Sequence, residues 1–96
     1  MQKAYVIGQI SIQNPENYEE YARKVVSTVT RFGGKYIVRG GSSVQLEGES
    51  LGDRNVIIEF PSNKRALDWY RSEDYNLIKH LRCDNTVGHL RLVEGI

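Results

Sequence analysis

Five polar residues interrupt stretches that otherwise resemble β-strands, and they are the residues best suited to chemistry: Gln9, Arg39, Glu59, His89 and Arg91. The guanidinium group of Arg39 offers a rigid fork of donors that matches a carboxylate, so it could hold an anionic substrate group. Glu59 or His89 could move a proton, because a histidine titrates near neutral pH. Gln9 and Arg91 would contact and orient the substrate. Together these residues predict a small-molecule site.

The same residues also allow a structural interpretation. Glu59 lies among apolar residues in a predicted strand, where an unpaired charge is costly to bury. A Glu59–Arg39 ion pair at the seam of a dimer would remove that cost without any ligand. His89 would then be a partly exposed strand residue with no chemical role. Both interpretations fit the sequence.

Aromatic residues with a polar end are numerous for a chain of this size. Such residues bury a ring while the hydroxyl or NH group finds a partner, which suits a pocket for a flat organic molecule. Helical spacing favours core packing for four of them: Tyr18, Tyr21, Trp69 and Tyr70. Tyr5 lies in a predicted strand instead, and we expect it to orient a substrate.

Motifs for metals, cofactors and covalent catalysis are missing from the sequence. It has no H-x-x-x-H or C-x-x-C spacing and no G-x-S-x-G elbow. The stretch "RGGSSVQL" (39–46) lacks the P-loop pattern and leads toward another strand, so no helix N-terminus would meet a phosphate there. A single cysteine, Cys83, cannot form an intramolecular disulfide. We therefore predict no metal and no cofactor.

Composition places the chain among ordinary globular domains. Its 96 residues fit one domain, and a net charge of +1 with 26% charged residues gives no basic field for nucleic acid. The apolar run within the first ten residues is too short, and too often interrupted by polar residues, for a signal peptide or a membrane span. We expect a cytoplasmic protein that binds neither nucleic acid nor membranes.

The elements that must position these residues follow from periodicity and from turn residues. Asn14, Ser62 and Ser72 are suited to cap helices, and Gly33 and Gly34 to end the first one. A possible extension of the second strand covers 44–47 ("VQLE"). The predicted strands are 3–12, 35–40, 54–60 and 86–95, and the predicted helical segments are 15–32, 63–72 and 72–84. This order predicts a ferredoxin-like βαββαβ domain, an α+β fold with helices on one face of a four-stranded antiparallel sheet.

Alternation along the strands separates the two faces of this sheet. The set expected under the helices is apolar: Val6, Gly8, Ile10, Val56, Ile58, Phe60, Leu90 and Leu92. The opposite set is mixed: Tyr5, Ile7, Gln9, Ile57, Glu59, Val87, His89, Arg91 and Val93. The second strand fits either way, and we assign Arg39 to the mixed face because the other polar residues lie there. That face is too apolar to remain exposed to solvent in a monomer, which predicts a homodimer.

An ordered set of short motifs spans the chain: "AYVIGQI", "GGKYIVRGG", "LEG", "EFPS", "DWY" and the closing "LVEG". In this respect the chain resembles the small bacterial proteins of the domain of unknown function 1330 family. The resemblance implies a fold similar to dimeric α/β-barrel proteins, a superfamily with antibiotic-biosynthesis monooxygenases and haem-binding members. It implies no established reaction. At "SEDY" (72–75) the sequence lacks the proline that commonly follows the serine in the family.

Two hypotheses of function follow. In the first, the cavity on the dimer-facing side of the sheet binds a small organic molecule, of which an organic anion is one candidate, as a simple binder or a cofactor-independent enzyme. In the second, the protein is a structural or accessory homodimer without small-molecule activity. An open pocket with unpaired arginine donors would favour the first hypothesis, and a sealed and fully paired seam would favour the second.

Overall fold

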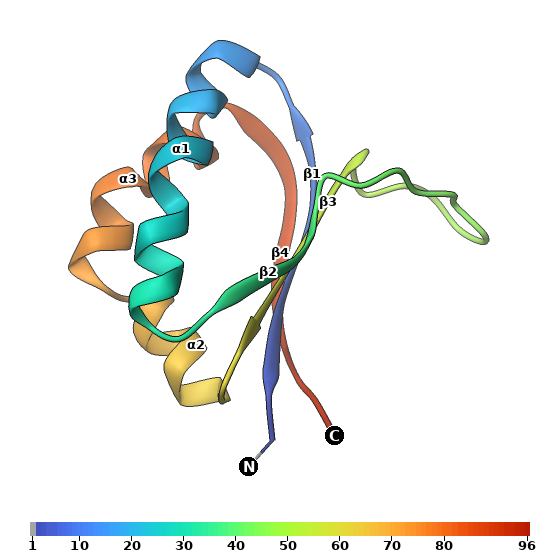
Figure 1. The fold of residues 1–96 in the computed structure, drawn as a ribbon. Helices are drawn as coiled ribbons and strands as arrows, with labels where there is room; N and C mark the ends of the chain where they lie inside the picture. Colours follow the sequence, from blue (N-terminus) through green and yellow to red (C-terminus); the bar gives the residue numbers. More distant parts are fainter. Residues whose placement is uncertain (1) are drawn as a thin grey trace.

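A computed structural model describes residues 2–96 as one layer of helices on one antiparallel sheet (Figure 1). The sheet order is β2-β3-β1-β4, which confirms the predicted ferredoxin-like arrangement. The predicted second helical region is two helices, separated at Arg71 and Ser72. The elements are β1 (Ala4–Ile12), α1 (Pro15–Arg31), β2 (Lys35–Arg39), β3 (Arg54–Phe60), α2 (Asn63–Tyr70), α3 (Glu73–Cys83) and β4 (Thr86–Glu94).

Each helix begins at a residue whose side chain caps it. Asn14 accepts a hydrogen bond from the backbone N–H of Asn17 at 3.2 Å, and Ser62 accepts one from Arg65 at 3.2 Å. Ser72 does the same for Tyr75 at 3.1 Å. These bonds satisfy backbone donors that have no partner within the helix, so all three predicted caps are confirmed.

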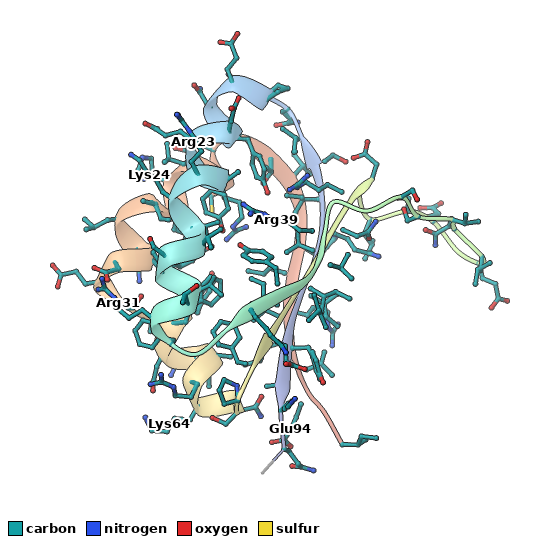
Figure 2. The ribbon with its side chains drawn as sticks, in the orientation of Figure 1. Arg23, Lys24, Arg31, Arg39, Lys64 and Glu94 are labelled. Carbon is teal, nitrogen blue, oxygen red and sulfur yellow. The ribbon has the colours of Figure 1, made fainter. Side chains whose placement is uncertain are left out.

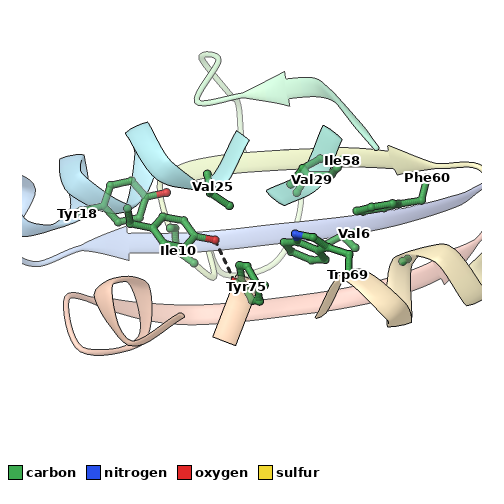
Figure 3. Close-up of a cluster of buried hydrophobic side chains, with 11 residues drawn as sticks. Val6, Ile10, Tyr18, Val25, Val29, Ile58, Phe60, Trp69 and Tyr75 are labelled. Carbon is green, nitrogen blue, oxygen red and sulfur yellow. Dashed lines mark hydrogen bonds between the residues drawn. The ribbon is translucent and has the colours of Figure 1, made fainter. Parts of the chain in front are cut away.

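The core lies between the helices and the sheet face that was predicted to be apolar (Figure 3). Trp69 is 1% exposed, and its indole N–H donates to Thr28 Oγ1 at 3.0 Å. The Trp69 ring lies 4.3 Å from the ring of Tyr75, centroid to centroid, and 5.4 Å from that of Phe60. The buried aromatic rings thus join α2 and α3 to the sheet.

A β-bulge in β2 decides where the polar residues of this strand lie. Tyr36 is opposite Ile58 and Val38 is opposite Ile57, so Ile37 is one extra residue on β2. Side chains alternate along a strand, and an extra residue reverses the alternation beyond it. Arg39 is therefore opposite Val56, on the helix-covered face, and its predicted place on the mixed face is wrong.

The segment 40–53 forms an arm that projects from the sheet on the side away from the helices (Figure 1). The pairing of β2 with β3 ends where the N–H of Gly40 donates to the carbonyl of Asn55 at 2.7 Å. The predicted strand extension over 44–47 is wrong, because this stretch has no strand partner in residues 2–96. Val44 and Leu46 on the arm are 82% and 89% exposed.

Candidate functional site

Most of the predicted site residues share the face of the sheet that the helices leave open, and we call it the open face. There the Tyr5 hydroxyl donates to Glu59 Oε1 at 3.4 Å, and Gln9 Nε2 donates to Asn55 Oδ1 at 3.3 Å. His89 is opposite Gln9 across the β1–β4 pair. The polar side chains of β1 and β3 on this face therefore already bind one another.

Glu59 has two lysine partners on the open face. Its carboxylate lies 3.4 Å from Lys35 Nζ and 3.6 Å from Lys3 Nζ. Burial raises the pKa of Glu59, but the two ammonium groups outweigh that effect and hold the pKa below its ordinary value. The predicted Glu59–Arg39 pair is wrong, because the bulge places Arg39 on the opposite face of the sheet.

Arg39 instead reaches from β2 toward α1, on the helix side (Figure 2). Its Nη2 donates to the backbone carbonyl of Ala22 at 2.6 Å. Its guanidinium carbon lies 4.7 Å from the centre of the Tyr36 ring, a cation–π arrangement. Arg39 thus spans the gap between the edge strand of the sheet and the middle of α1.

Two further arginines lie beneath the helices. Arg54 is opposite Ile10 on the covered face, with its guanidinium carbon 5.5 Å from the centre of the Tyr18 ring. Its Nε is buried and has no hydrogen-bond acceptor within residues 2–96. Arg82 on α3 donates through Nε to the Tyr75 hydroxyl at 3.2 Å.

These three arginines border one cavity between α1, α3 and the sheet. We call it the arginine pocket and define it by the arginines and tyrosines of its lining: Arg39, Arg54, Arg82, Tyr18, Tyr21 and Tyr36. Its free volume is about 30 Å³, enough for a few water molecules or for the head group of a ligand. No Asp, Glu or His of residues 2–96 contributes to this lining. The pocket thus combines three positive charges with an aromatic wall.

Two tyrosines of the pocket, Tyr21 and Tyr36, are neutral hydrogen-bonding groups at ordinary pH. Burial raises the pKa of Tyr36 to about 12, although Arg39 and Arg54 oppose that rise. Burial, together with the hydroxyl of Tyr75, raises the pKa of Tyr21 well above its ordinary value of 10.0. Neither phenol therefore offsets the charge of the arginines.

A second, larger hollow lies beside β4. Its volume is about 260 Å³, and Trp69, Tyr70 and Leu92 lie on its wall. Arg91 borders this hollow, opposite Ile7 in the β1–β4 pair. Aliphatic and aromatic side chains make up the rest of the wall, so within residues 2–96 Arg91 is the one charged residue that borders this hollow.

Arg54 and Arg82 are absent from the predicted site, although the sequence holds a signal for both. Arg54 has the same strand parity as Val56 and Ile58, which places it on the covered face. Arg82 follows Tyr75 by seven residues, two helical turns along one side of α3. The bulge that moves Arg39 has no comparable signal, since no glycine or proline marks it.

Other chemical groups in residues 2–96 are isolated. No three His, Cys, Asp or Glu side chains lie close enough in this range to hold a metal ion. Cys83 is a free and exposed thiol, and His80 is exposed on α3. Over the same residues, no helix is long and apolar enough to cross a membrane.

The fold and the pocket define a ferredoxin-like α+β protein with an open sheet face and a small cationic cavity beneath its helices. The chain belongs to the family called domain of unknown function (DUF1330), whose profile matches residues 3–96. No curated protein matches the sequence.

Solved structures of other proteins share the fold, and two of them illustrate the likeness. The RPA0582 protein of unknown function from Rhodopseudomonas palustris is 20% identical, with a TM-score of 0.74 over 97% of this chain and 80% of that one. A dimeric ferredoxin-like protein of unknown function from Thermobifida fusca YX is 10% identical, with a TM-score of 0.55 over 99% and 92%. At these identities the likeness extends to the fold and no further.

Proposed function

We propose that this protein binds a small organic anion in the arginine pocket. The observation that carries the proposal is the convergence of Arg39, Arg54 and Arg82 on one aromatic cavity whose lining holds no acidic side chain. A guanidinium group removed from water is costly unless an anion or an acceptor compensates it. The buried Nε of Arg54 has no such acceptor among residues 2–96, so a bound anion would supply what the fold omits.

The proposed role is binding, without proton transfer by Glu59 or His89. Both residues belong to the open face, and the sheet separates them from the arginine pocket. The described lining of the pocket provides no carboxylate or imidazole that could act as a general base. The predicted association of Arg39 with an anion is retained, but in a different cavity from the predicted one.

We also propose that the open face packs against a second copy of the chain, as in a dimeric α/β barrel. The side chains of Val87 and Val93 on this face are 58% and 42% exposed. Tyr5, Gln9 and Glu59 already have partners there and would fix the register of two facing sheets. The dimeric description of the Thermobifida fusca protein supports this arrangement. Light scattering after size exclusion should give twice the 11.0 kDa chain mass, and a monomer at micromolar concentration would contradict it.

The binding proposal is tested by calorimetric titration with a panel of small aliphatic and aromatic carboxylates. Arg54→Gln should weaken binding by about tenfold or more, because it removes one of the three positive charges of the cavity and the Nε donor that has no acceptor in residues 2–96. Arg91→Gln is the matched control, since Arg91 lies outside the arginine pocket, and it should leave the affinity unchanged. No binding of any acid by the wild-type protein, or equal effects of the two variants, would overturn the proposal.

A further inference from the structure

The hydrogen-bond chain behind the pocket identifies the class of anion and a residue that recognises it. We infer that the hydroxyl of Tyr21 donates a hydrogen bond to the carboxylate of an organic acid, which enters the pocket with its carboxylate leading. Arg82 orients this hydroxyl through Tyr75. This inference rests on the proposed function and adds to it a ligand class and a specific donor.

The direction of the hydrogen bonds follows from what each group can donate. A guanidinium has no acceptor, so Arg82 Nε donates to the Tyr75 oxygen at 3.2 Å. The hydroxyls of Tyr75 and Tyr21 are 3.0 Å apart, the bond drawn as a dashed line in Figure 3. Tyr75 is 0% exposed, and the Tyr21 oxygen is the acceptor within reach of its hydroxyl among residues 2–96. We therefore infer that Tyr75 donates to Tyr21, because the hydroxyl hydrogen left without a protein acceptor then belongs to the residue that lines the cavity.

This direction leaves the hydroxyl hydrogen of Tyr21 unused. If Tyr21 donated instead, the buried Tyr75 hydroxyl would accept twice and its own hydrogen would lack an acceptor, at a cost of about 1–3 kcal/mol. Tyr21 lines the arginine pocket, and within residues 2–96 its hydroxyl has no hydrogen-bond partner other than Tyr75. Its raised pKa keeps the phenol protonated over the physiological range. The Tyr21 hydroxyl is thus a fixed hydrogen-bond donor that has no acceptor within residues 2–96.

A second donor without an acceptor belongs to another residue of the same lining. Arg54 Nε is buried without an acceptor in residues 2–96, and Gly40 leaves room for the guanidinium group. A Cβ at Gly40 would lie within contact distance of Arg54 Nη1, so a larger residue there would displace the arginine. Two donors and no obligate acceptor select a ligand group that only accepts hydrogen bonds.

The size of the cavity favours a carboxylate head group. Its volume of about 30 Å³ holds the three heavy atoms of a carboxylate but not the ring or chain of an organic acid. The remainder of the ligand would extend past the exposed Arg39 and along the Tyr36 ring, at the mouth between β2 and α1. A tetrahedral phosphate, with more oxygens and a larger charge, would leave more of its acceptors unmatched.

The test compares three tyrosine-to-phenylalanine variants by calorimetric titration with benzoate. Tyr21→Phe should weaken benzoate binding by about 10- to 100-fold, the usual effect of losing a hydrogen bond to a charged group. Tyr75→Phe should weaken it less, since Tyr21 keeps its donor but loses its orientation. Tyr70→Phe is the matched control: Tyr70 lies outside the arginine pocket and outside the hydrogen-bond chain, so affinity should stay within about twofold.

The outcomes separate this inference from the proposed function. If the wild-type protein binds benzoate and Tyr21→Phe binds it equally well, the role of Tyr21 is overturned while the pocket stands. If inorganic phosphate binds the wild-type protein more tightly than benzoate, the carboxylate class is overturned. If the wild-type protein binds no anion, the proposed function itself fails. Matching melting temperatures and circular dichroism spectra would establish that the variants fold.

Discussion

The two faces of the sheet differ in which kind of group lacks a partner. On the face under the helices the apolar side chains are satisfied, and Trp69, Phe60 and Tyr75 are almost completely buried. On the open face the polar side chains of Glu59 and Gln9 are satisfied by neighbours on the same sheet. Within residues 2–96, the groups that lack a partner are therefore polar on the face under the helices and apolar on the open face.

This difference underlies the two roles that we propose for the faces. The open face retains exposed apolar side chains, which another apolar surface would cover. The covered face retains arginine and tyrosine donors inside a small cavity, which an anion would satisfy. The protein would thus assemble through one face of the sheet and bind its ligand behind the other.

The largest expected effect contrasts a core residue with an open-face residue. Trp69→Ala should lower the free energy of unfolding by about 3–5 kcal/mol, because it leaves a large cavity in the core and removes the bond to Thr28. Val87→Ala should change it by no more than about 0.5 kcal/mol at low protein concentration. The free energy of unfolding of both variants is measured by urea unfolding, followed by far-ultraviolet circular dichroism because that signal does not depend on Trp69.

Protein concentration sharpens this contrast. If a second copy covers Val87, the cost of Val87→Ala should grow as concentration rises, because dimerisation then contributes to stability. The cost of Trp69→Ala should not depend on concentration in the same way. Equal costs for both variants at low concentration would contradict the division between the two faces.

A smaller effect is expected at the two glycines that follow Arg39. Gly40 has a φ of 75°, and its Cβ would meet Arg54, so Gly40→Ala should cost about 1–2 kcal/mol and weaken carboxylate binding. Gly41 lies in open space, which makes Gly41→Ala a matched control with little effect on either property. Urea unfolding and calorimetric titration measure the two properties. If the Gly40→Ala variant bound carboxylates as tightly as the wild type, the conformation of this turn would have no influence on the arginine pocket.

The smallest effect concerns the pH dependence of the open face. The pKa of Glu59 is lowered by Lys35 and Lys3, so its ion pairs stabilise the fold above the ordinary glutamate pKa of 4.5. That stability is lost as pH falls through the lower pKa of the folded state. The wild type should therefore exceed Glu59→Gln in stability at pH 7 and lose this advantage as the pH is lowered step by step below 4.5, as measured by thermal unfolding at each pH. An advantage that grew on acidification would contradict the lysine pairing.

The sequence predicts the parts of this molecule that depend on local patterns. Alternation along β1, β3 and β4 assigns their side chains correctly, and the caps at Asn14, Ser62 and Ser72 define where the helices start. The same alternation would have placed Arg54 beneath the helices. These features follow from short-range rules that the rest of the fold does not override.

The placement of β2 does not follow from such rules. Both parities of β2 carry apolar residues, so alternation cannot choose a face, and the extra residue Ile37 changes parity within the strand. The bulge is visible only in the pairing with β3. As a result the predicted site combines Arg39 with Glu59, two residues that lie on opposite faces of the sheet.

The most direct test of the account follows the arginine side chains during a titration with benzoate. The Nε–H resonances of the protein would be recorded by ¹⁵N NMR, with Arg54→Gln and Arg91→Gln used to assign the two critical signals. We predict that the Arg54 Nε–H signal shifts saturably while the Arg91 signal stays in place. A saturable shift at Arg91 with none at Arg54 would place the ligand outside the arginine pocket and contradict the central claim.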